Sequence, residues 1–91
     1  MNVIIFDTVF ERLININDYC ISHFSNSSFC KKIENEMYQF IDVLEKGVYR
    51  PSSKEFTFVL KSNYILYCYY DNDTIYIVDL LSSKQRRELK G

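Results

Sequence analysis

The residue types that most often catalyse reactions or bind metals are few in this sequence and far apart. His23 is the single histidine, so a serine–histidine–aspartate set would have to use it, yet it lies far in sequence from the C-terminal strands. We interpret it as a solvent-facing or helix-capping residue. Cys20, Cys30 and Cys68 are odd in number and lack CxxC spacing. We expect buried free thiols, with neither a disulfide framework nor a zinc site.

Phosphate and metal chemistry find little support elsewhere in the chain. The two glycines, Gly47 and Gly91, cannot form a glycine-rich phosphate loop. The carboxylates between residues 34 and 45 share their segment with lysines, as on a solvated helix face. We therefore expect no cofactor and no bound metal.

The C-terminal tail, residues 82–91, is the strongest charge feature. It carries a net charge of +3, whereas the other 81 residues sum to −4. Such a tail can simply keep the protein soluble, or it can act as an electrostatic anchor for an acidic protein or a nucleic acid.

Composition and patterning predict one domain spanning residues 1–91. Hydrophobic residues make up 47% of the chain and charged residues 25%, as in ordinary globular proteins. The first apolar run, residues 3–6, is too short for a signal peptide or a membrane span. We expect a cytoplasmic protein with no membrane partner.

The N-terminal half predicts a strand and two helices. Residues 2–6 are rich in β-branched side chains and predict a short strand. Thr8 and Glu11 have the spacing of a capping box, which would begin a helix reaching Phe24. The apolar stripe of this helix is wide, so we expect it to be covered on two sides.

A second helix is predicted after the polar break at residues 25–28, whose serines can cap it. Its apolar residues recur with helical period from Phe29 to Leu44. Gly47 followed by Val48 predicts a Schellman stop, and Pro51 prevents resumption. Because the connection is short, the two helices should form an antiparallel hairpin.

Residues 55–81 predict a three-stranded antiparallel meander with turns at Ser62-Asn63 and Asn72-Asp73. If both turns have two central residues, alternation assigns one uncharged face to the helices. That predicted inner face comprises Phe56, Phe58, Leu60, Ile65, Tyr67, Tyr69, Tyr76, Val78 and Leu80.

The opposite face is then more apolar in its middle than a solvated sheet requires. The residues concerned are Val59, Leu66, Cys68, Ile75 and Ile77. An exposed apolar patch on a small protein favours partner binding, although a chain segment or a like subunit could also cover it.

The order of elements resembles the RelE/ParE superfamily of toxins from bacterial type II toxin–antitoxin systems. The first helix, FERLININDYCISHF, and the second, FCKKIENEMYQFIDVLEKG, carry part of this likeness. The strands NYILYCYYDNDTIYIVDLL, followed by SSKQRR, are similar to the family's pattern of a YRILY strand, a polar turn, an I-x-I strand and a basic end. The resemblance implies an α+β fold of the β-α-α-β-β-β type.

The resemblance also implies a function and partners. Toxins of this superfamily inhibit bacterial growth and are neutralised by a cognate antitoxin, which would cover the apolar patch described above. ParE-like members act on DNA gyrase, whereas RelE-like members are endoribonucleases that cut mRNA on the ribosome. A non-toxic interaction module of the same fold is a third alternative.

Two departures from the family pattern weaken the nuclease alternative. Tyr64 occupies the position of the usual arginine in YRILY, and Ser82 or Ser83 that of a common histidine. RNA cleavage needs a general base and a cation for the phosphate. We favour ParE-like action on gyrase, and we leave the catalytic residues unassigned. The candidate target-binding residues are Lys54, Lys61, Tyr64, Lys84, Arg86 and Arg87.

Overall fold

Six elements make up the computed structural model, which describes residues 1–84. They follow in the order β-α-α-β-β-β, which confirms the predicted α+β class. The elements are β1 (Asn2–Ile5), α1 (Asp7–Phe24), α2 (Ser28–Glu45), β2 (Glu55–Val59), β3 (Tyr64–Asp71) and β4 (Thr74–Ser82). Within residues 1–84, no helix is both long and apolar enough to cross a membrane.

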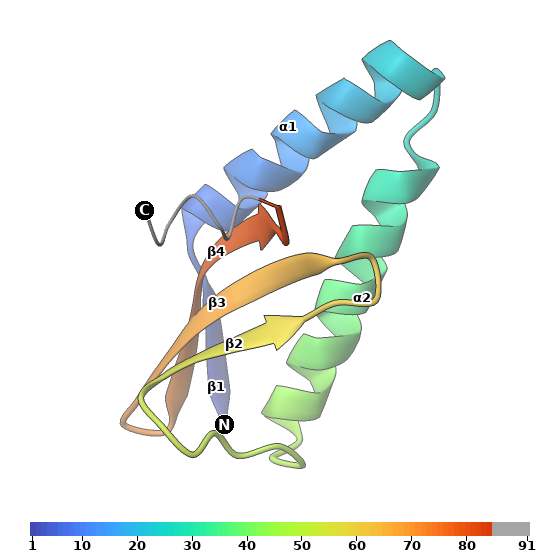
Figure 1. Cartoon of the computed structure of the whole chain (residues 1–91). Helices are drawn as coiled ribbons and strands as arrows, with labels where there is room; N and C mark the ends of the chain where they lie inside the picture. The colour runs from blue at the N-terminus through green and yellow to red at the C-terminus, as the bar shows by residue number, and fades with distance from the viewer. Residues whose placement is uncertain (85–91) are drawn as a thin grey trace.

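The four strands form one mixed sheet in the order β1-β4-β3-β2. The predicted meander is present, with β2, β3 and β4 antiparallel. β1 pairs in parallel with β4, which is possible because two helices and two strands separate them along the chain. Both helices lie on the same side of the sheet and leave its other side without a helix (Figure 1).

The helix starts differ from the predicted caps. α1 begins at Asp7 after Phe6, without a side-chain cap, so the capping box of Thr8 and Glu11 is wrong. At α2 the Oδ1 atom of Asn26 accepts hydrogen bonds from the Ser28 amide and hydroxyl, at 3.1 and 2.6 Å. The local cap acceptor is therefore the asparagine rather than a serine.

The end of α2 is confirmed in detail. Gly47 has φ +72, a conformation that suits glycine because it has no Cβ. Its amide donates to the carbonyl of Leu44 at 3.0 Å, and the Val48 amide donates to that of Val43 at 3.3 Å. These two bonds define the predicted Schellman motif.

The core lies between the helices and one face of the sheet. Helix residues such as Leu13 and Met37 are buried there, and the Phe40 ring stacks on Phe58 with centroids 3.8 Å apart. α1 is buried along one face only, because Ile14 and Phe24 are each 60% exposed. The prediction that this helix is covered on two sides is wrong. The strands, together with the residue that follows β2, supply six buried residues to this core: Leu60, Leu66, Cys68, Ile75, Ile77 and Leu80.

The β2–β3 connection explains why the predicted face of β3 is wrong. The Leu60 amide donates to the Tyr64 carbonyl at 2.7 Å, so the loop has three residues, and its last residue, Asn63, has φ +66. Phe58 therefore pairs with Leu66 instead of Tyr67. A shift of one residue turns a strand over. The side chains of β2 that face the helices are those predicted, whereas in β3 Leu66 and Cys68 face the helices.

The predicted faces of β4 are also wrong, first because β3 is turned over and then because β4 contains a bulge. Its turn at Asn72 and Asp73 is as predicted, with both residues at positive φ and Tyr69 opposite Tyr76. Because β3 is turned over, Ile75 and Ile77 face the helices, and Tyr76 and Val78 do not. Cys68 pairs with Ile77 but Tyr67 pairs with Asp79, which leaves Val78 as an extra residue. This bulge returns Leu80 to the core, where it was predicted.

Candidate partner-binding site

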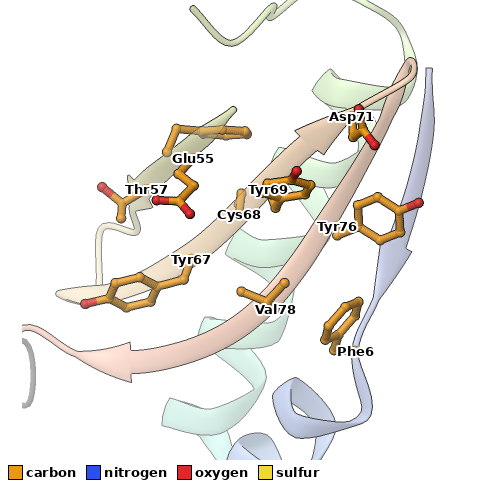
Figure 2. A pocket seen from close by; sticks show the side chains of 10 residues that line it. Phe6, Glu55, Thr57, Tyr67, Cys68, Tyr69, Asp71, Tyr76 and Val78 are labelled. Carbon is orange, nitrogen blue, oxygen red and sulfur yellow. The ribbon is translucent and has the colours of Figure 1, made fainter. Parts of the chain in front are cut away.

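The helix-free side of the sheet, which we call the open face, contains a depression of about 870 Å³. Three tyrosine rings of β3 and β4 lie along it, and Phe6 closes one side (Figure 2). The lining side chains that define the open face are Phe6, Glu55, Thr57, Tyr67, Tyr69, Asp71, Tyr76 and Val78.

A row of aromatic rings crosses this face. The Phe6 and Tyr76 rings meet edge to face with centroids 6.1 Å apart, and Tyr76 and Tyr69 are 6.3 Å apart. Tyr69 is also the cross-strand partner of Glu55, so the row ends at a carboxylate. Tyrosine combines a large apolar ring with a polar tip, which suits a surface that alternates between water and a partner.

The charged groups lining the open face are carboxylates. Glu55 and Asp71 line the depression, and within the described residues its lining includes no lysine, arginine or histidine. The face therefore favours cations over phosphate.

The Tyr67 hydroxyl is a further polar group of the open face. It is buried, and no hydrogen-bond partner is found for it among the described residues. Leaving a buried hydroxyl unpaired costs about 1–3 kcal/mol.

The predicted apolar patch does not exist as a surface. Leu66, Cys68, Ile75 and Ile77 are at most 4% exposed and pack against the helices, because β3 is turned over relative to the prediction. Burial also raises the pKa of the Cys68 thiol to about 12. Of the predicted patch, Val59 is exposed, at 54%, on the edge strand β2.

Three of the predicted target-binding residues lie at one end of the sheet. Lys61 is in the β2–β3 loop, Tyr64 starts β3 opposite Ser82, and Lys84 follows β4. Lys54 lies at the other end, where its carbonyl accepts a hydrogen bond from the Tyr70 amide at 2.7 Å. The remaining two, Arg86 and Arg87, lie outside the described residues.

Tyr64 and Lys84 line a second depression, of about 600 Å³, together with Arg12 and Tyr19 of α1. Arg12 is paired with Asp79 through distances of 3.0 and 3.4 Å. Burial raises the pKa of Tyr64, with smaller contributions from nearby thiols, so its phenol is protonated at neutral pH. It cannot serve there as a general base.

His23 matches its predicted role at the solvent-facing end of α1. Its ring stacks on that of Tyr19 with centroids 3.9 Å apart, and its Nδ1 lies 3.0 Å from the Tyr19 carbonyl oxygen. These contacts are local to the helix end.

The open-face residues that the sequence analysis missed are Tyr67, Tyr69, Tyr76 and Val78, which it assigned to the core. One signal could have identified the tyrosines. Their neighbours Leu66, Ile75 and Ile77 are purely aliphatic and gain more from complete burial, whereas a tyrosine hydroxyl must find a partner when buried.

Comparison with known proteins places the fold in a class. No protein-family model matches the sequence, and no curated protein matches it either. The fold is nevertheless similar to that of a solved structure, and it has the β-α-α-β-β-β order that the resemblance implies.

The solved structure that carries this conclusion is "Chromosomal ParDE TA system from P. aeruginosa". The superposition has a TM-score of 0.68 and covers 90% of this chain and 95% of that chain, at 15% sequence identity. At this identity the likeness concerns the fold.

Proposed function

We propose that this protein is the toxin of a type II toxin–antitoxin system, which inhibits bacterial growth and is neutralised by a cognate antitoxin. The observation that carries the proposal is the fold shared with a ParDE system over 90% of the chain. The aromatic open face supports it, because a surface of this kind on a small protein favours a protein partner. We assign the antitoxin to this face in place of the residues now found in the core.

We further propose ParE-like action on DNA gyrase through the basic tail. The lining of the open face, as far as the structure describes it, offers no cation to stabilise a phosphate in flight. Tyr64, in the place of the family arginine, is protonated at neutral pH. Both observations favour binding over RNA cleavage.

Induction of the protein alone in a bacterium tests this proposal. We expect growth arrest together with loss of plasmid supercoiling, and purified protein should inhibit gyrase in the same assay. A matched culture that expresses the protein with an early stop codon controls for induction. Growth arrest with unchanged supercoiling would rule gyrase out.

A ribosome-dependent endoribonuclease is the alternative that a specific observation favours. Lys61, Tyr64 and Lys84 lie at the same end of the sheet, where two cations and an aromatic ring could hold an RNA segment. Under this alternative, mapping of mRNA ends after induction finds new cuts within translated transcripts. Intact transcripts during growth arrest would exclude it.

A non-toxic interaction module of the same fold remains the third proposal. It predicts normal growth under strong expression, with retained binding of an antitoxin-like protein. The reading frame beside the gene identifies that protein, which we expect to be small and acidic.

A further inference from the structure

We infer that the partner segment covering the open face presents a basic side chain, arginine or lysine, to Glu55 and Asp71. The inference deepens the proposed antitoxin-binding role and rests on it. It commits the occupant of the depression to an apolar peptide segment with one cation.

The two carboxylates belong to the same end of the same face. Glu55 is the cross-strand partner of Tyr69, and Asp71 follows Tyr69 by two positions in β3, so all three side chains project from one side of the sheet. Figure 2 shows Glu55 and Asp71 on either side of the Tyr69 ring. A cation above this ring would lie near both.

The aromatic row strengthens the attraction. Tyr69 and Tyr76 lie beside the carboxylates with ring centroids 6.3 Å apart. An arginine can stack its guanidinium plane on a phenol ring and still donate hydrogen bonds to a carboxylate at its edge. A lysine ammonium can also lie over a phenol ring and donate to a carboxylate, although without the planar stacking of arginine.

Neighbouring charges leave this attraction in place. Lys54 precedes Glu55 in the chain, but it does not line the depression. Asp73, in the turn that follows Asp71, adds a further exposed carboxylate to this end of the sheet. Among the described residues, the charged side chains that line the depression itself are the two carboxylates.

The rest of the depression is apolar and sets what flanks the cation. Tyr67, Val78 and Phe6 line it on the side away from the carboxylates, with Thr57 as a small polar contact. A complementary segment carries aliphatic or aromatic side chains on the same face as its basic residue. The depression therefore favours a segment that mixes one basic residue with apolar residues over a segment of consecutive charged residues.

Selection from a phage-displayed library of random 16-residue peptides tests this inference, because it does not require the natural partner to be identified. After selection on the wild-type protein, we expect enriched peptides to share one arginine or lysine among apolar residues. Binding of a selected peptide should shift the ring NMR signals of Tyr67, Tyr69 and Tyr76. Replacing its basic residue by glutamine should weaken binding roughly tenfold, as measured by calorimetry.

The double variant Glu55→Gln, Asp71→Asn should bind the arginine peptide about tenfold more weakly than wild type does. Its affinity for the glutamine peptide should equal that of wild type. The control variant Asp18→Asn, Glu45→Gln removes two exposed carboxylates of the helices and should bind like wild type. Circular dichroism confirms folding of each variant. The peptide substitution alone still decides the question if the double variant does not fold.

Selected peptides without basic enrichment, peptides that shift signals outside the open face, or equal binding of both peptides would overturn the inference. Growth arrest on induction does not depend on these measurements. If the protein is toxic but binds the arginine and glutamine peptides equally, the inference is refuted and the toxin function is not. If the protein is non-toxic but prefers the arginine peptide, the toxin function is refuted and the inference is not.

Discussion

Ile77 and Val78 are neighbours in β4 that meet opposite surroundings. Ile77 is fully buried against the helices, whereas Val78 is the extra residue of the bulge and lines the open face. Their side chains differ by one methylene group, so substitution of each by alanine reports mainly on where the side chain lies.

We expect Ile77→Ala to lower the free energy of unfolding by about 2–5 kcal/mol, because it leaves a cavity in the core. Val78→Ala should cost less than about 1.5 kcal/mol, since only part of the side chain is buried. Urea denaturation followed by circular dichroism measures both. Equal losses would contradict the assignment of faces.

The burial of Cys68 on the helix side of β3 predicts how stability depends on pH. Its pKa is raised by burial from 9.0 to about 12, so the unfolded chain loses this proton first as the pH rises. Ionisation of the thiol does not affect stability below pH 9, and it lowers the free energy of unfolding progressively between pH 9 and about 12.

Stability should therefore fall in this range less steeply for Cys68→Ala than for wild type, by up to about 1.4 kcal/mol per pH unit. Both proteins keep Cys30, whose pKa is raised to about 11, chiefly by burial, and whose contribution cancels in the comparison. Urea denaturation at intervals from pH 8 to about pH 11 measures the two slopes. Parallel curves would mean that the Cys68 thiol is accessible in the folded state.

The β2–β3 loop decides which side of β3 faces the helices. Its three residues, 61–63, set the pairing of Phe58 with Leu66, and the left-handed Asn63 closes the turn. A two-residue loop would move the tyrosines of β3 toward the core and its aliphatic residues toward water.

Deletion of Ser62 should abolish cooperative unfolding, because the shortened loop demands that other register. The variant Ser62→Ala keeps the loop length and loses the hydroxyl bond to Glu36, at 2.9 Å, which should cost about 1 kcal/mol. Deletion of exposed Ser52, in the connection before β2, should leave a folded protein. Thermal denaturation of the three variants checks this prediction. A Ser62 deletion that unfolds as cooperatively as the Ser52 deletion would contradict it.

The elements were predictable because each has a local cause. The helical period marks α2, Gly47 ends it, and Asn72-Asp73 specifies its turn. The faces of β3 were not predictable from turn residues alone, because Ser62-Asn63 fits a two-residue loop as well as the end of a three-residue loop. The bulge at Val78 has no local signal. The predicted patch was lost through the loop, and the bulge changes only the part of β4 beyond Ile77. The grouping of Lys61, Tyr64 and Lys84 arises from strand pairing that sequence alone does not display.

At the scale of the whole molecule, carboxylates and lysines are unevenly distributed along the sheet. Glu55, Asp71 and Asp73 lie with a single lysine, Lys54, toward the end with the β3–β4 turn, while Lys61 and Lys84 lie toward the end where β4 finishes. The tail that continues from Lys84 carries further cations. The two ends are suited to different partners, a cation-bearing segment on the open face and an acidic target beyond β4.

This separation predicts that the double variant Arg86→Ala, Arg87→Ala loses toxicity and keeps its fold and its open-face binding. Its cations are removed from the tail, whereas the core residues that hold the sheet lie between Val9 and Leu80. The matched control Lys31→Ala, Lys32→Ala removes two neighbouring cations from the exposed side of α2 and should remain toxic.

Three measurements separate a role of the tail in target binding from effects on folding or on the open face. They are growth after induction, thermal denaturation and affinity for the selected peptide. Loss of toxicity in the tail variant alone, with all three proteins equally stable and equally able to bind the peptide, assigns target binding to the tail. If the tail variant is folded and fully toxic, the target must instead contact the body of the protein. The grouping of Lys61, Tyr64 and Lys84 would then be the next surface to substitute.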